Sequence, residues 1–189
     1  MYIYITMENF NTLTIETERL LLVPISIQYA QEIFKEFTPE ITTYMFPKSP
    51  EHITETEKFI QESIDKNINW KNYQIAILDK ITKEFLGCWG LHLKNPEAPE
   101  LGIRIKKWSF GKKIGREAVA GLADRAQNNL EFEYLYYPVD KDNIPSRKIA
   151  ESLWWILERD SDGKEKVQTK DTLDPNRKLN GVEYRIPKR

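Results

Sequence analysis

Three consecutive strand patterns between residues 73 and 107 constrain the fold of this chain more than any other feature of its sequence. They read YQIAIL (73–78), EFLGCWGLHL (84–93) and ELGIRIKK (100–107), and only a short polar turn and the segment KNPEAP separate them. Strand patterns joined by short polar connections are typical of neighbouring strands that run antiparallel. The run therefore predicts an antiparallel meander.

Helical and strand patterns flank this meander. Residues 13–25 carry the leucine and β-branched content of a strand, and further strands are expected at 133–139, 166–171 and 182–187. Apolar residues recur at helical spacing in 26–37, 49–68, 114–129 and 144–157. We expect Ser49 to cap the second of these helices, with Pro50 in its first position. The predicted order is β-α-α-β-β-β-α-β-α-β-β, a mixed α/β fold with a mixed sheet.

Length and charge restrict the possible functions. A chain of 189 residues favours one domain over residues 1–189, whose first twelve residues can form a flexible segment. The 28 basic and 29 acidic residues nearly cancel, so an anion must be bound by a local cluster of charges. The sequence shows neither a signal peptide nor an apolar run of about 18 residues. We therefore expect a cytoplasmic protein that binds no membrane.

The segment FGKKIGREA (110–118) lies where a strand pattern ends and a helical pattern begins. The first N–H groups of a helix have no partner within it, so a glycine-containing turn at this position can hold a phosphate. Residues 104–116 also contain six basic residues and no acidic one: Arg104, Lys106, Lys107, Lys112, Lys113 and Arg116. The alternative is that these are the solvated ends of a strand and a helix. The spacing is that of neither a P-loop nor a GxGxxG dinucleotide site.

Two segments resemble the GNAT superfamily of N-acyltransferases. ELGIRIKKWSFGKKIGREAV (100–119) is similar to its strand, pyrophosphate loop and helix, in which the loop follows Q/R-x-x-G-x-G/A. PVDKDNIPSRKIAESL (138–153) resembles its later strand and helix with an N-x-x-S pattern, which is usual in the ribosomal-protein N-acetyltransferase branch. The order of predicted elements also matches. The resemblance implies an acyltransferase enzyme that uses acetyl-CoA and releases CoA.

The resemblance also implies where the cofactor binds. The pyrophosphate site would be formed by backbone amides from Phe110 to Arg116, and the pantetheine arm would pair with the strand at Ile103, Arg104 and Ile105. Asn143 and Ser146 match later contacts to the cofactor, although Asn143 is also a reasonable helix cap. The full set is Ile103, Arg104, Ile105, Phe110, Gly111, Lys112, Lys113, Ile114, Gly115, Arg116, Asn143 and Ser146.

The chain departs from the family pattern at several positions. Lys113 replaces the first loop glycine, and we expect its φ to be negative so that its side chain avoids the phosphates. Gly115 keeps the second glycine, where we expect any Cβ to intrude on the pyrophosphate. Trp154 and Trp155 stand where a Gly-Gly or Gly-Phe pair commonly ends the helix, and Ala150 replaces a tyrosine found in many relatives.

Acetyl transfer to an amine needs a group that removes a proton from the ammonium. Glu100 is the first candidate for this base, although it can equally be a solvated loop carboxylate; Glu97 and His92 compete for the role. By resemblance, Ser146 would protonate the departing thiolate. Cys88, the single cysteine, lies in the apolar run FLGCWGL, and we expect it to be a core residue rather than a nucleophile. We expect no metal site.

The sequence gives less information about the amine that accepts the acetyl group. Residues 32–65 contain eight acidic and three basic residues, in helices that border the acceptor in this superfamily. An acidic wall would favour a cationic amine, such as a protein N-terminus, a polyamine or an aminoglycoside; the alternative is that these are solvated outer faces. The leading hypothesis is direct transfer in a ternary complex to a primary amine, with a homodimer possible. The second is a non-catalytic CoA-binding module. A nucleic-acid binder ranks last, because the net charge is near zero.

Overall fold

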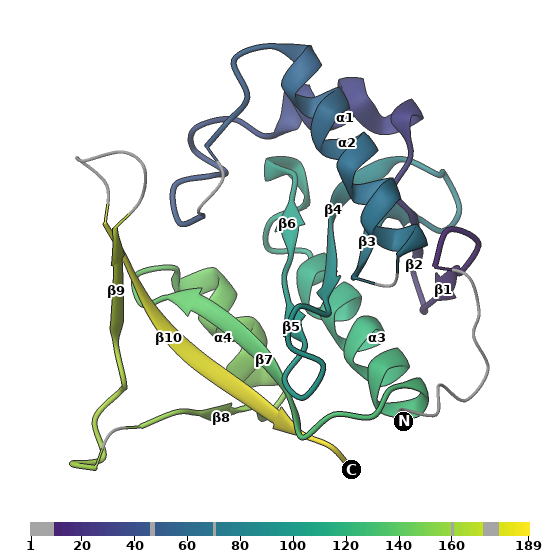
Figure 1. Cartoon of the computed structure of the whole chain (residues 1–189). Coiled ribbons are helices and arrows are strands. Elements are labelled where there is room, and N and C mark those ends of the chain that lie inside the picture. Colours follow the sequence, from purple (N-terminus) through teal and green to yellow (C-terminus); the bar gives the residue numbers. More distant parts are fainter. Residues whose placement is uncertain (1–9, 46–47, 70, 160, 172–177) are drawn as a thin grey trace.

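The computed structural model describes residues 10–45, 48–69, 71–159, 161–171 and 178–189 (Figure 1). Its helices are α1 (Ala30–Glu36), α2 (Ile53–Ile68), α3 (Ile114–Asn129) and α4 (Ile144–Ser152), with 3-10 turns η1 (Ile27–Tyr29) and η2 (Lys107–Ser109). Its strands are β1 (Ile15–Glu16), β2 (Leu20–Pro24), β3 (Asn72–Asp79), β4 (Phe85–His92), β5 (Glu100–Leu101), β6 (Arg104–Ile105), β7 (Tyr134–Asp140), β8 (Ile156–Leu157), β9 (Gln168–Asp171) and β10 (Lys178–Pro187).

The strands form one mixed sheet in the order β1-β2-β3-β4-β5-β7-β10-β8, with β6 paired to β4 and β9 paired to β10. Strands β3, β4 and β5 are antiparallel neighbours, as are β4 and β6, which confirms the predicted meander. The pair β5–β7 is parallel. The predicted mixed α/β fold is therefore confirmed.

Two predicted strands are each divided in the structure. Residues 13–25 form the hairpin β1–β2, whose turn is held by α3: the Glu117 carboxylate accepts hydrogen bonds from Thr17 Oγ1 (2.5 Å) and from the Arg19 backbone N–H (2.7 Å). Residues 100–107 form β5 and β6, which are separated at Gly102 and Ile103. This second break shapes the site described below.

Helix α2 begins later than predicted. Its N-cap is His52 rather than Ser49, because the Glu55 carboxylate reaches back to the His52 N–H (3.0 Å) and completes a capping box. Since the helix starts at Ile53, Pro50 is not its first residue.

Helix α4 is shorter than predicted and ends with a left-handed tryptophan. Trp154 has φ of 58°, and its N–H bonds to the Glu151 carbonyl, while the Trp155 N–H bonds to the Ala150 carbonyl (both 3.1 Å). These two bonds form a Schellman motif, in which glycine usually occupies the left-handed position. The turn therefore forms without the glycine that the family commonly has.

The helices cover opposite faces of the sheet. Helices α3 and α4 pack on one face over a core that includes Leu22, Ile75, Leu122 and Tyr137. Helices α1 and α2 pack on the other face over a second cluster around Ile33, Ile60, Ala76 and Cys88.

The amino-terminal segment joins the first of these cores. Phe10 is buried and stacks on Tyr73 with ring centroids 5.1 Å apart; residues 1–9 lie outside the described residues. Among the helices that the structure describes, none is long and apolar enough to cross a membrane.

Candidate active site

The sheet opens between β6 and β7. Strand β5 pairs with β7 at Glu100 and Tyr136, but beyond the break at Gly102 the chain continues as β6, which pairs with β4. A pocket of about 1320 Å³ occupies the region where the strands diverge. Residues of β6, α3, β7 and α4 line one part of it, and the α1–α2 connection with the ends of α2, β3 and β4 lines another. An elongated ligand can thus contact the sheet edge and both helix layers.

The loop before α3 has an unusual backbone. Gly111 and Lys113 have φ of 74° and 61°, so both lie in the left-handed region. The expectation of a negative φ at Lys113 is therefore wrong: Lys113 is the N-cap of α3 in the left-handed conformation. A left-handed residue followed by a right-handed one directs successive N–H groups to one side and forms an anion-binding concavity.

The first turn of α3 leaves its amides available at that concavity. Glu117 donates its N–H to the Lys113 carbonyl (3.1 Å), the first bond that closes the helix. The N–H groups of Ile114, Gly115 and Arg116 precede it and, by helix geometry, have no intrahelical acceptor. The loop therefore has the backbone arrangement that favours a phosphate group.

Gly115 has a packing role in addition to the predicted one beside the pyrophosphate, which stays a prediction. A Cβ at this residue would lie 3.0 Å from Ile149 Cδ1 and 3.5 Å from Ile105 Cγ1. The absent side chain thus allows α3 to approach α4 and β6 closely. Substitution there would first disturb packing between these elements.

The basic residues of 104–116 do not form one cluster. Lys106 and Lys107 are ion-paired with Glu84 and Glu40, respectively. Arg104, Lys113 and Arg116 line the pocket, and so does Lys148 from α4, which sequence reasoning missed. Lys112 lies outside the pocket, with its carbonyl accepting from Arg19 Nη1 (3.1 Å). Proximity in sequence therefore overstated the charge at the loop.

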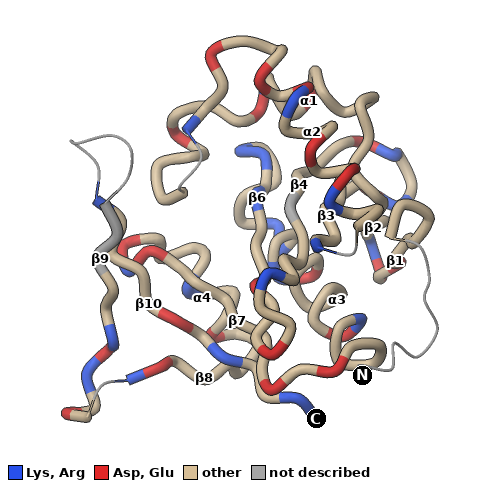
Figure 2. Tube along the Cα trace, in the orientation of Figure 1, with Lys and Arg blue, Asp and Glu red and all other residues tan. Residues whose placement is uncertain are grey.

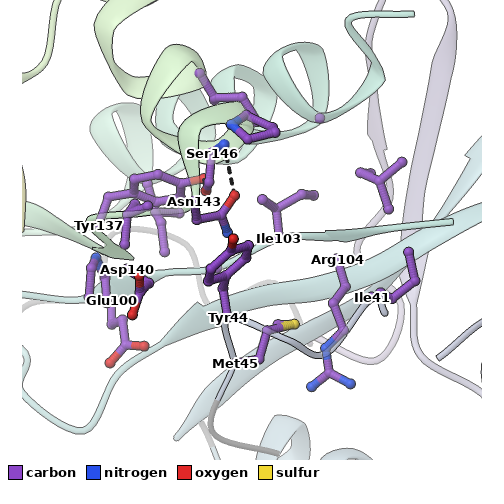
Figure 3. A pocket seen from close by; sticks show the side chains of 18 of the residues that line it. Ile41, Tyr44, Met45, Glu100, Ile103, Arg104, Tyr137, Asp140, Asn143 and Ser146 are labelled. Atoms are coloured by element: carbon purple, nitrogen blue, oxygen red, sulfur yellow. Dashed lines mark hydrogen bonds between the residues drawn. The ribbon is translucent and has the colours of Figure 1, made fainter. Parts of the chain in front are cut away.

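Asn143, Ser146 and Tyr137 meet at the start of α4 (Figure 3). The Asn143 side chain accepts from the Ser146 N–H (3.2 Å), which confirms the predicted cap. The Ser146 hydroxyl is 2.7 Å from the Tyr137 hydroxyl. Burial raises the pKa of Tyr137 to about 12, so its phenol stays protonated near neutral pH. The sequence did not single out Tyr137, because it is adjacent to Tyr136 and the sequence alone does not tell which of the two tyrosines of β7 faces α4.

The three candidate bases occupy different surroundings. Glu100 and His92 are register partners on β5 and β4, and both line the pocket. Glu97 lies in the exposed loop before β5, outside the pocket, where its carbonyl accepts from the Glu133 N–H (2.8 Å). Burial, followed by the charges of Lys94, Lys66 and Arg104, lowers the pKa of His92 to about 4. Both Glu100 and His92 are thus unprotonated candidates within the pocket, whereas Glu97 lies outside it.

Cys88 and Arg104 are cross-strand partners on the face covered by α1 and α2. Cys88 is fully buried, as predicted, and burial raises the pKa of its thiol to about 12. The Arg104 guanidinium lies 4.5 Å from the centre of the Phe37 ring, and burial lowers its pKa to about 10. At neutral pH the thiol is therefore protonated and the guanidinium remains charged.

Most of the predicted site residues share this single pocket. Those that line it are Glu100, Ile103, Arg104, Ile105, Phe110, Gly111, Lys113, Ile114, Gly115, Arg116, Asn143 and Ser146. Lys112 is the exception. Ile41, Tyr44 and Met45, from the connection between α1 and α2, also line the pocket and had no signal in the sequence (Figure 3).

Solved structures share this architecture at low sequence identity. A proposed ribosomal-protein-serine acetyltransferase from Vibrio cholerae is 19% identical with a TM-score of 0.77, and the match covers 94% of this chain and 98% of that one. The microcin C7 self-immunity acetyltransferase MccE, in complex with acetyl-CoA and AMP, is 17% identical with a TM-score of 0.74, over 90% and 93% of the two chains.

Sequence comparisons give the family directly. An uncharacterized N-acetyltransferase, p20, from Bacillus licheniformis is 27% identical over 143 residues, which cover 74% of this chain and 80% of that protein. The acetyltransferase (GNAT) domain model matches residues 19–153, which is more than half of the chain. On this match, together with the diverging strands and the open start of α3, the chain belongs to the GNAT acetyltransferase family and is an acyltransferase enzyme.

Proposed function

We propose that this enzyme transfers an acetyl group from acetyl-CoA directly to a primary amine, of a protein N-terminus or a small molecule. The observation that carries the proposal is the divergence of β6 from β7, which joins the start of α3 and Glu100 in one pocket. GNAT acetyltransferases use acetyl-CoA, which supplies the acetyl thioester when bound.

The residues present fit this cofactor. Strand β4 occupies one edge of β6, and the opposite edge offers the backbone groups of Ile103 to Ile105 to the amides of a pantetheine arm. The concavity from Phe110 to Arg116 would hold the pyrophosphate, with Lys113, Arg116 and Lys148 adding positive charge.

Two residues would move protons. Glu100 would accept a proton from the acceptor ammonium, directly or through water, since an amine must be neutral to attack. Ser146 would donate a proton towards the departing sulfur, and Tyr137 would position the Ser146 hydroxyl through their hydrogen bond. Aligning the two reactants can itself supply roughly 7 to 11 kcal/mol of the barrier reduction.

The test is CoA release from acetyl-CoA with a panel of amines, with mass spectrometry of each product. We expect amine-dependent release, initial-rate kinetics of a ternary complex and no acetylated enzyme intermediate. A Cys88→Ser variant should retain direct transfer, because this buried thiol takes no part. Tight CoA binding without thiol release for any amine would instead indicate a non-catalytic binding module.

A further inference from the structure

Four cations line the part of the pocket around His92 and the end of β4. We call this part the acceptor arm and define it by Lys66, Lys71, Lys94 and Arg104, together with Glu100. These residues come from α2, from the segments flanking β3 and β4, and from β5 and β6. Their separation in the sequence explains why no basic cluster was visible there.

Backbone hydrogen bonds hold three of these cations at one end of the sheet. The Lys71 N–H bonds to the carbonyl of Lys66, in the last turn of α2 (3.0 Å). The Leu93 N–H bonds to the Lys71 carbonyl (2.9 Å), which places Lys94 next to the start of β3. The three lysines thus border the pocket on a fixed frame, although their side chains are exposed.

Arg104 adds a buried positive charge to the same arm. The residue is 6% exposed and its guanidinium lies against Phe37 and Phe59, yet Arg104 lines the pocket. A planar guanidinium is suited to carboxylate and phosphate groups, to which it can donate two parallel hydrogen bonds. A charge held in such surroundings acts more strongly on a ligand than a fully solvated one.

Acidic residues offset only part of this positive charge. Glu62, one turn earlier on α2, lies 3.8 Å from Lys66, and most acids that line the pocket are engaged elsewhere. Glu40 is ion-paired with Lys107 (2.8 Å), and Asp140 accepts the N–H groups of Asn180 (2.8 Å) and Asp142 (2.9 Å). Glu183 accepts from Gln168 Nε2 (2.9 Å) and lies 3.6 Å from Arg185. Glu100, the proposed base, is the fourth acid among the described residues that line the pocket.

The acidic residues of 32–65 do not form a wall of the pocket, in agreement with the alternative that they are solvated outer faces. Of the eight acidic residues in 32–65, Glu40 alone lines the pocket, and the others are on outer surfaces of α1, α2 and their connection (Figure 2). Burial is the main cause of the lowered pKa of His92, and the charges of Lys94, Lys66 and Arg104 lower it further, which places all three close to this ring. The field in the arm is therefore positive.

From this arrangement we infer that the acceptor carries an acidic group, carboxylate or phosphate, close to the amine that is acetylated. The inference rests on the proposed function: the amine lies at Glu100, and the acidic group lies among Lys66, Lys71, Lys94 and Arg104. A polyamine acceptor would place further positive charge beside these four cations, which disfavours it.

Matched acceptors test this inference on the unmodified enzyme. The carboxylate pair is alanyl-glutamate and the corresponding diamide; the phosphate pair is phosphoethanolamine and ethanolamine; spermidine is the cationic probe. Two quantities are measured: kcat/KM from thiol release, and equilibrium binding of each probe to enzyme saturated with CoA. We expect at least one acidic probe to exceed its neutral counterpart about tenfold in both, and the preference to shrink at high salt.

Charge reversal on the arm provides the second part of the test. Lys66→Glu with Lys94→Glu should remove the preference for the acidic probe and leave the affinity for acetyl-CoA unchanged. The matched control is Lys58→Glu, an exposed residue of the same helix outside the pocket, which should retain the preference. These surface changes avoid the packing of Arg104 on Phe37, so misfolding is not expected to obscure the result.

The outcomes separate the two proposals. Neutral probes or spermidine that bind and react as well as the acidic probes would overturn this inference while leaving acetyl transfer intact. A preference that survives charge reversal at Lys66 and Lys94 would overturn it as well. Preferential binding of acidic probes without thiol release would support the acidic acceptor and contradict the proposed function.

Discussion

The two arms of the pocket are built in different ways. We call the part that we propose binds the cofactor the cofactor arm, and it is formed by β6, the loop 106–113 and the starts of α3 and α4. It comes largely from one continuous segment and presents backbone groups. The acceptor arm is assembled from side chains that lie far apart in the sequence. Recognition through backbone groups depends less on side-chain identity, so on this proposal the loop can hold the cofactor with Lys113 in place of a glycine. The acceptor preference, in contrast, depends on a few charges and is the more easily altered by substitution.

The largest expected effect is that of substituting Glu100, which should lower turnover without changing cofactor binding. Glu100→Gln should lower kcat by about a hundredfold or more and shift the pH optimum upward, since the acceptor must then lose its proton to solvent. Affinity for acetyl-CoA, measured calorimetrically, should stay unchanged. Glu97→Gln is the control and should behave as the parent enzyme, because Glu97 lies outside the pocket. A wild-type pH profile in Glu100→Gln would exclude Glu100 as the base.

Burial of His92 beside the cations of the acceptor arm should make the stability of the fold depend on pH. The folded pKa of His92, about 4, lies below the usual value of 6.5, so the unfolded chain takes up a proton first as the pH falls. The contribution of the neutral His92 side chain to the free energy of unfolding is therefore fully present above pH 6.5 and is lost as the pH falls from 6.5 to 4.

Replacing His92 should reduce this loss. Between pH 7 and 5, His92 accounts for a loss of about 2 kcal/mol in the free energy of unfolding of the parent protein. The loss over the same range should be about 2 kcal/mol smaller in His92→Asn. The measurement is urea unfolding at both pH values. Identical decreases in parent and variant would mean that the imidazole titrates normally.

Adjacent lysines test whether the pocket or the net charge controls cofactor binding. Lys113→Glu should weaken acetyl-CoA binding about tenfold, roughly 1.4 kcal/mol, because Lys113 lines the pocket. Lys112→Glu makes the same change of charge one residue away, outside the pocket, and should have a smaller effect. Both effects should diminish at high salt. Equal losses in calorimetric titrations would assign the effect to net charge alone.

The smallest expected effect concerns the left-handed backbone of Lys113. Lys113→Gly should raise the free energy of unfolding by about 1 kcal/mol, because a side chain at φ of 61° is unfavourable. Acetyl-CoA affinity should change by less than about tenfold, since the amides remain. Lys112→Gly, at a residue outside the left-handed region, should not be stabilising. Thermal unfolding that is unaltered or lower in Lys113→Gly would contradict the assigned strain.

Much of the fold was predictable because it depends on short-range patterns. Period-2 and helical spacing located the meander and the four helices, and local turn chemistry identified the Asn143 cap. The errors arose where tertiary contacts override local preference. Glu117 on α3 stabilises the turn that divides residues 13–25, and pairing of β6 with β4 but β5 with β7 divides residues 100–107.

The sequence by itself indicated the family, the four helices, the central meander and the continuous segment that we propose binds the cofactor. It did not show the division of two strands or the strand β8 at residues 156–157, which were predicted as helix. Only the tertiary structure decided which charged residues face the pocket: Lys66, Lys71 and Lys94 join it, whereas Lys106, Lys107 and Lys112 do not. The physical reason is that a local pattern fixes the backbone path within a few residues. The direction and neighbours of a long charged side chain, in contrast, depend on strand register and on helices that are distant in the chain.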